Sequence, residues 1–176
     1  MKKMLGEDRR TLLLNYLRSS NQAFTGSQLA KLTNVSRQVI VNDMNLLKAR
    51  NEPIIATSQG YLYIHNNETS PLFERKIVSI HPPEKTEEEL FTIVDCGATV
   101  KNVIVEHPVY GEITANLHVS NRLEVEHFLH QLHTTNAQLL SALTDGTHLH
   151  LISASSEETL NTVEEQLRKK GFLLES

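Results

Sequence analysis

The sequence predicts a two-domain α+β protein. Residues 1–65 show three helical segments followed by one short hairpin, whereas residues 74–176 intersperse strand patterns with helix patterns. The charge divides similarly, because residues 1–50 contain nine Lys and Arg against three Asp and Glu, and residues 51–176 contain eight against eighteen. The polar stretch 66–73 contains a proline and is expected to link the two domains.

Three short helices are expected at the start of the first domain. Residues 8–19 form the first, Ser27 is expected to cap the second, and Ser36 is expected to cap the third. Apolar residues recur at helical spacing in the first and third segments: Leu13, Tyr16 and Leu17, then Ile40, Met44 and Leu47. Residues 54–64 then read as two short strands around a turn that contains Gly60, which predicts a hairpin.

This order of elements is that of a winged helix-turn-helix. In such a domain the third helix enters the major groove, and exposed side chains near its start contact base edges. Hydroxyl groups near the start of the preceding helix can hold a phosphate. We therefore predict two sets of DNA contacts: Ser36, Arg37, Gln38 and Asn42 for bases, and Thr25 and Ser27 for phosphates. The alternative is a three-helix packing module whose polar face binds nothing, but the basic charge of this segment favours a polyanionic partner.

The first domain also resembles a known family. The segment TGSQLAKLTNVSRQVIVNDMNLLKARN has a Leu-Ala pair, a Val-Ser-Arg turn and an Asp43-x-x-x-Leu47 run. These features resemble the compact winged helices of biotin-operon-type repressors, and the resemblance covers residues 7–65. It implies that double-stranded operator DNA is a partner of this chain.

In the second domain we expect a mostly antiparallel sheet covered by helices. Strands are predicted at 76–80, 100–107, 112–120 and 147–154, with a short final strand at 172–175. Helices are predicted from Pro82 to about Asp95, over 121–132, and from a Ser156 cap to Gly171. Because the two kinds of element alternate, helices are expected to cover one face of the sheet.

Histidines suggest a metal site in this domain. On a strand, His148 and His150 point to the same face and can converge on one ion. His81 ends a strand, and the acidic run 87–89 begins the next helix. Three imidazoles and one carboxylate would suit Zn, Ni, Co or Fe. The alternative is a pair of surface histidines on an exposed strand face.

The remaining histidines carry less information. Spacing of i, i+3 and i+6 spreads His127, His130 and His133 around a helix, where solvated or partly packed positions are expected. We expect His65 and His118 to be structural or surface positions.

A second resemblance covers nearly all of residues 74–175. It rests on His81 followed eight residues later by Glu89-Leu90, then VIVEHPVYGEI, THLHLISA and the closing KKGFL. These ordered motifs resemble the three-histidine (3H) domain that follows a winged helix in niacin-responsive repressors.

The 3H resemblance implies a site, an effector and an assembly. It implies one divalent metal per chain, nickel or zinc, held by four residues: His81, Glu89, His148 and His150. It implies a homodimer that represses genes of NAD biosynthesis or niacin uptake, with nicotinic acid as co-repressor. Within the family motif His-Pro-Val-Tyr-Gly, His107 and Tyr110 are candidate effector-pocket residues.

Composition excludes several other classes. The single Cys96 excludes an internal disulfide framework and a thiolate zinc cluster. No apolar run reaches the roughly 18 residues of a membrane span, and the N-terminus lacks the apolar region of a signal peptide, so we expect a cytoplasmic protein. Two other functions stay open. One is a metal-responsive regulator, and the other is a metal-dependent hydrolase, which is disfavoured by the lack of a clear general base, nucleophile elbow or phosphate-cradling loop.

Overall fold

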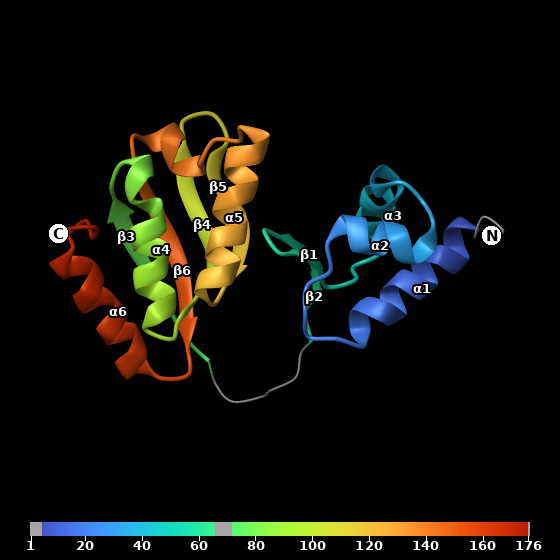
Figure 1. The fold of residues 1–176 in the computed structure, drawn as a ribbon, viewed down its shortest axis with the longest axis horizontal. Helices are drawn as coiled ribbons and strands as arrows, with labels where there is room; N and C mark the ends of the chain where they lie inside the picture. Colours follow the sequence, from blue (N-terminus) through green and yellow to red (C-terminus); the bar gives the residue numbers. More distant parts are fainter. Residues whose placement is uncertain (1–4, 66–71, 176) are drawn as a thin grey trace. The chain divides into compact units, whose positions relative to one another are not determined.

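The computed structural model describes residues 5–65 and 72–175, which form two compact units. The contacts divide the chain into Met1–Asn67 and Glu68–Ser176, and each unit is described by itself (Figure 1). Most of the predicted linker, residues 66–71, lies outside the described residues, and Phe73 already pairs with Ala154 in a sheet. In the described ranges, no helix is both long and apolar enough to cross a bilayer.

The first unit contains three helices and a hairpin. The elements are α1 (Gly6–Arg18), α2 (Gly26–Thr33), α3 (Arg37–Ala49), β1 (Ile54–Thr57) and β2 (Gly60–Tyr63). Their inward faces form one core: Leu13, Leu17, Leu29, Ala30, Ile40, Met44, Leu47 and Ile54. The helical spacing in the sequence therefore marks the buried stripe of α1 and α3, although Tyr16 is exposed.

Two of the three helices in this unit begin at hydroxyl caps. Ser36 accepts a hydrogen bond from the Val39 amide, as predicted. The prediction for α2 is wrong, because Thr25 rather than Ser27 is its N-cap. Thr25 Oγ1 accepts from the Gln28 amide, while the Gln28 side chain accepts from the Thr25 amide. This reciprocal pair satisfies two backbone donors, so the helix begins two residues earlier than a Ser27 cap would allow.

The hairpin is held against the start of α2. Tyr61 exchanges backbone hydrogen bonds with Phe24 at 2.8 and 2.9 Å. Gly60 has a φ of 123°, and any side chain there would collide with the backbone of Phe24. Glycine is therefore required at this turn for both reasons.

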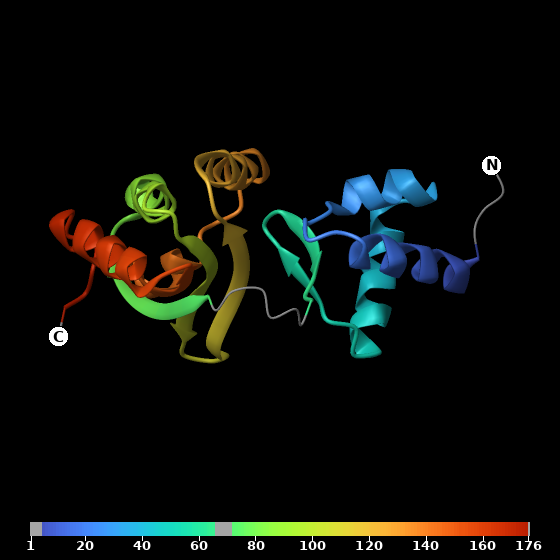
Figure 2. The same ribbon diagram turned by 90° about the horizontal axis from the view of Figure 1, so that it is seen from below.

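The second unit is a four-stranded sheet with helices on one face. The strands are β3 (Phe73–Ile80), β4 (Thr99–His107), β5 (Gly111–Val119) and β6 (Thr147–Ala154), and their order is β3-β6-β4-β5. Every neighbouring pair is antiparallel. Figures 1 and 2 show the helices α4 (Thr86–Asp95), α5 (Arg122–Thr135) and α6 (Glu157–Lys169) on the same side of the sheet. The α+β prediction is confirmed.

Two predicted elements differ from the structure. Pro83–Lys85 form a short 3-10 helix, η1, and the α-helix begins only at Thr86. The final strand predicted at 172–175 is wrong, because Leu173 forms only a single bridge to Ser79. Backbone hydrogen bonds from Ile80 and Leu174 nevertheless hold this segment beside the edge strand β3. A second 3-10 helix, η2 (Leu140–Thr144), precedes β6.

Candidate metal centre and nucleic-acid interface

Four predicted side chains come together between the sheet and the start of α4. His81 directly follows β3, Glu89 lies in the first turn of α4, and His148 and His150 lie on the face of β6 that points towards the helices. Alternation along β6 places both imidazoles on that face. All four side chains are buried, and Glu89 is 0% exposed.

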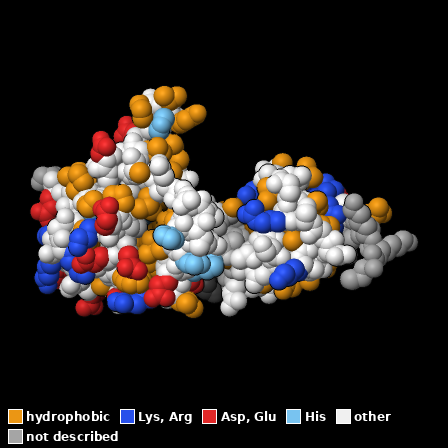
Figure 3. Space-filling model, turned by 45° about the horizontal axis from the view of Figure 1, so that its top comes forward, with side chains coloured by type: hydrophobic (Ala, Val, Ile, Leu, Met, Phe, Trp, Pro, Cys, Tyr) orange, Lys and Arg blue, Asp and Glu red, His pale blue; other side chains and the backbone are white. Residues whose placement is uncertain are grey.

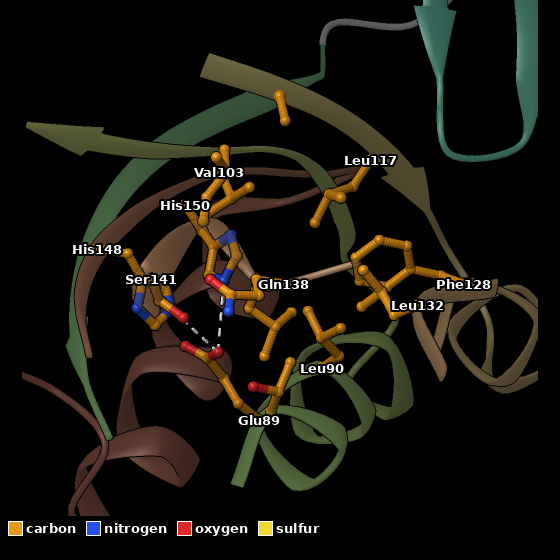
Figure 4. A pocket seen from close by; sticks show the side chains of 14 residues that line it. Glu89, Leu90, Val103, Leu117, Phe128, Leu132, Gln138, Ser141, His148 and His150 are labelled. Carbon is orange, nitrogen blue, oxygen red and sulfur yellow. Dashed lines mark hydrogen bonds and ion pairs between the residues drawn. The ribbon is translucent and has the colours of Figure 1, made fainter. Parts of the chain in front are cut away.

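One carboxylate oxygen is the common point of this cluster. Glu89 Oε2 lies 2.7 Å from Nε2 of His81, 3.2 Å from Nε2 of His148 and 3.4 Å from Nε2 of His150. The potential ligand atoms of His81, Glu89 and His148 all lie within 4.8 Å of one another. Figure 4 shows Glu89 reaching towards the two histidines of β6. The cluster is therefore compact enough to surround one ion.

The opposite ring nitrogens orient the three imidazoles. Nδ1 faces a backbone carbonyl oxygen in each ring: Pro82 for His81 at 2.9 Å, Gly146 for His148 at 2.9 Å, and Asn102 for His150 at 2.8 Å. A carbonyl only accepts, so Nδ1 carries the proton and donates it. Each Nε2 is then left with either a lone pair or a second proton. This outer arrangement is typical of metal-binding histidines.

Burial and the Glu89 carboxylate shift the pKa values of the buried histidines in opposite directions. Burial alone would lower the pKa of His81 and of His150, but the hydrogen bonds and charge of Glu89 outweigh it and raise both pKa values. For Glu89, burial would raise the pKa, but the three imidazoles lower it well below its ordinary value. A carboxylate surrounded in this way requires positive charge close by.

A divalent cation fits these donors. Glu89 Oε1 is buried and has no hydrogen-bond partner within the described part of the chain, so one carboxylate oxygen is left unsatisfied. Three imidazole nitrogens and a carboxylate form a donor set suited to a borderline transition metal. Such an ion would replace protons at Nε2 and provide the positive charge. The group formed by His81, Glu89 and His148 could therefore hold a metal.

Gly146 brings His81 and His148 together and was not foreseen from the sequence. Its carbonyl oxygen accepts from His148 Nδ1 and also lies 3.4 Å from the backbone amide of His81. Its φ is 92°, and a side chain there would collide with the His81 carbonyl oxygen. Only glycine allows this close approach without strain.

The predicted base-contacting residues are exposed on the first half of α3. Arg37, Gln38 and Asn42 face solvent together with Ser36, and Gln38 Nε2 donates to Asn42 Oδ1 at 3.3 Å. Such a helix can present amide and guanidinium groups to base edges. On the face seen in Figure 3, charged side chains of the first unit are mainly Lys and Arg, while the second unit shows many Asp and Glu.

The predicted phosphate-contacting residues lie at the start of α2. Ser27 is exposed, whereas Thr25 is half-buried and uses its hydroxyl oxygen as a cap. An oxygen that accepts a capping bond still carries a hydroxyl proton that can be donated. The start of a helix also favours an anion. Both residues are therefore placed where a phosphate contact is chemically reasonable.

Each of the two units matches a known protein family. Residues 74–176 match the 3H domain family, and residues 9–62 match an HTH domain family. The chain is 50% identical to the transcription repressor NadR of Bacillus subtilis over 98% of this chain and 96% of that protein. It is 38% identical to the probable transcription repressor NiaR of Thermotoga maritima over 98% of this chain and 97% of that protein.

This chain belongs to the NadR/NiaR family of transcription repressors. The family assignment confirms the resemblance seen in the 3H motifs and the winged helix-turn-helix. The relatives are named as repressors, in agreement with the prediction of a regulator rather than an enzyme.

In this NadR/NiaR-family chain, the cluster of His81, Glu89, His148 and His150 adjoins a pocket of about 180 Å³. Glu89, His148 and His150 form part of its wall, and apolar side chains from α4, α5 and the sheet form much of the rest (Figure 4). The labelled apolar residues are Leu90, Val103, Leu117, Phe128 and Leu132. No pattern in the sequence indicates this pocket, because its walls meet only in the folded unit.

The predicted effector residues His107 and Tyr110 do not line this pocket. They lie where β4 turns into β5, and Tyr110 is 77% exposed. His107 Nδ1 accepts from the backbone amides of Val109 and Tyr110, so its ring stabilises the turn. Their effector role stays a prediction.

The remaining histidines do not join the cluster. His127, His130 and His133 are exposed on α5, in agreement with solvated positions. His65 and His118 are half-buried, and burial lowers the pKa of His118.

Proposed function

We propose that this chain is a metal-dependent, nicotinic-acid-responsive repressor of genes for NAD biosynthesis or niacin uptake, and that it acts as a homodimer. The observation that carries the proposal is the buried cluster of three histidines and Glu89 beside an apolar pocket. A site with this combination can hold a cation and a small aromatic ligand next to each other.

One divalent cation per chain, nickel or zinc, would be held by His81, Glu89, His148 and His150. A doubly charged ion with one carboxylate and three neutral imidazoles leaves one positive charge in a buried place. That charge favours a monoanionic effector over a neutral one. Nicotinic acid is a monoanion at neutral pH, and its carboxylate or ring nitrogen could bind at the cation.

DNA recognition would use α3 and the start of α2. The base contacts are assigned to Ser36, Arg37, Gln38 and Asn42, and the phosphate contacts to Thr25 and Ser27. In a homodimer two such helices would read half-sites about one helical turn, or a multiple of it, apart. Nicotinic acid would act as co-repressor by binding more tightly to the DNA-competent state than to the other state.

The experiment is a gel-shift titration on an operator obtained by selection from random DNA. In the metal-loaded protein, nicotinic acid is expected to tighten operator binding by a factor of about 5–150, and removal of the metal by a chelator should abolish this gain. Sedimentation of the same complex should show two chains per operator.

Two outcomes would change the proposal. Operator binding that follows the metal alone, with no response to nicotinic acid, would instead identify a metal-responsive regulator. Operator binding that responds to neither would reject the sensing role of the second unit.

A further inference from the structure

Besides Glu89 Oε1, the pocket beside the histidine cluster has a second buried polar atom without a hydrogen-bond partner among the described residues. Thr86 is 8% exposed and lines the pocket, and its Oγ1 has no hydrogen-bond partner in the residues that the structure describes. A buried hydroxyl without a partner is costly, and native proteins rarely leave one unsatisfied. Thr86 therefore points to a ligand group that completes its hydrogen bonding.

The dimensions and the walls of the pocket limit what that ligand can be. Its volume is about 180 Å³, and an apolar cavity of about 150 Å³ holds one benzene molecule. The pocket therefore fits one six-membered aromatic ring with a small substituent. Leu90, Phe128 and Leu132 offer apolar surface to the ring (Figure 4). The polar side chains that line the pocket are Thr86, Glu89, Gln138, Ser141, His148 and His150.

We propose that this pocket is the effector site and that the Thr86 hydroxyl donates a hydrogen bond to the carboxylate of a small aromatic acid bound there. The proposal rests on the proposed function, because the acid is taken to bind beside the metal. It places recognition at the start of α4, next to Glu89, rather than at the turn that contains His107 and Tyr110. Thr86 is then a selectivity residue of the sensor.

The test compares Thr86→Val with Thr86→Ser in the metal-loaded full chain. Valine keeps the shape and removes the hydroxyl, whereas serine keeps the hydroxyl. Titration calorimetry with nicotinic acid should show affinity weakened about 10–100-fold in Thr86→Val, as expected for the loss of a hydrogen bond to a charged group. Thr86→Ser should stay within about 3-fold of the wild type on the same scale.

A stability measurement separates recognition from a structural role. Because Thr86 Oγ1 has no hydrogen-bond partner among the described residues, Thr86→Val should leave the ligand-free, metal-loaded protein as stable as the wild type or more stable. Its metal affinity should also be unchanged. A lower melting temperature of ligand-free Thr86→Val would instead show that the hydroxyl supports the fold, and would overturn the proposal.

The location of the site is tested by fluorescence, since the chain contains no tryptophan. Phe128→Trp puts a single reporter on the pocket wall, and Tyr110→Trp puts a matched reporter on the exposed turn. Nicotinic acid should change the emission of Phe128→Trp with the affinity found by calorimetry, and should leave Tyr110→Trp unchanged. A response only in Tyr110→Trp would overturn the assignment of this pocket as the effector site.

Nicotinic acid binding by the wild type and by Thr86→Val distinguishes a failure of the proposed function from a failure of this inference. If the metal-loaded wild type does not bind nicotinic acid, the proposed function fails and this inference fails with it. If the wild type binds nicotinic acid and Thr86→Val binds it equally well, only the assignment of Thr86 is overturned.

Discussion

Replacing Glu89 by glutamine should remove most of the stabilisation that a bound metal ion would provide. Glu89 is fully buried, and its Oε2 lies within 3.4 Å of three imidazole nitrogens. Glutamine keeps the size of the side chain but removes the anionic donor. Changes to groups that only support a metal ligand already weaken binding about 10–100-fold, so loss of the carboxylate itself should cost at least about 100-fold.

The expected effect can be followed by calorimetric melting. At a free metal concentration of about 100 times the wild-type Kd, the ion stabilises the wild type by about 2.7 kcal/mol, and a variant with 100-fold weaker binding gains only about 0.4 kcal/mol. For a small domain this corresponds to a metal-induced rise in melting temperature of roughly 10–20 °C in the wild type, against about 2–3 °C in Glu89→Gln.

The matched control is Glu88→Gln. Glu88 lies in the same helical turn but pairs at the surface with Lys85 and Lys170. Its replacement should leave the metal-induced rise unchanged. A full metal-induced rise in Glu89→Gln, or loss of the rise in Glu88→Gln, would show that Glu89 is not the carboxylate ligand.

Arg37→Ala should weaken operator binding by about 1–3 kcal/mol and relax base preference at one position. If the variant keeps the affinity and the base preference of the wild type, Arg37 does not contact a base. Gly60→Ala should destabilise the first unit by about 1–3 kcal/mol in urea denaturation, because the left-handed turn and the Phe24 backbone exclude a side chain; unchanged unfolding would count against this. The metal-free second unit should lose stability as the pH rises above about 6.5. The folded state raises the pKa values of His81 and His150 above those of the unfolded chain, so their protonation stabilises the fold at low pH and this contribution is lost as they deprotonate. The metal-loaded unit should gain stability over the same range, since fewer protons compete for the ligands; parallel pH profiles would contradict the competition.

Local patterns in the sequence predicted much of the cluster. The i, i+2 spacing of His148 and His150 on an alternating strand places both on the face that the helices cover. The Ser156 cap is also confirmed, because its side chain accepts from the Thr159 amide. Such features depend on residues close in the chain, and a single sequence contains them.

Other features depend on contacts that no local pattern encodes. The carbonyl groups of Pro82 and Asn102 orient His81 and His150. Every residue has a backbone carbonyl, so the residue types at these positions do not reveal this role. The pocket exists only because α5 packs beside α4 over the sheet, so its walls could not be assembled from separate segments. The misplaced cap of α2 is different, since the Thr25-x-x-Gln28 spacing is itself a capping-box signal.

The decisive measurement for the metal site is anomalous X-ray diffraction from crystals of the zinc-loaded protein, recorded on both sides of the zinc absorption edge. One strong peak per chain is expected, about 2.0–2.1 Å from the Nε2 atoms of His81, His148 and His150 and a similar distance from a Glu89 oxygen. A peak on the exposed histidines of α5, or no peak beside Glu89, would contradict it.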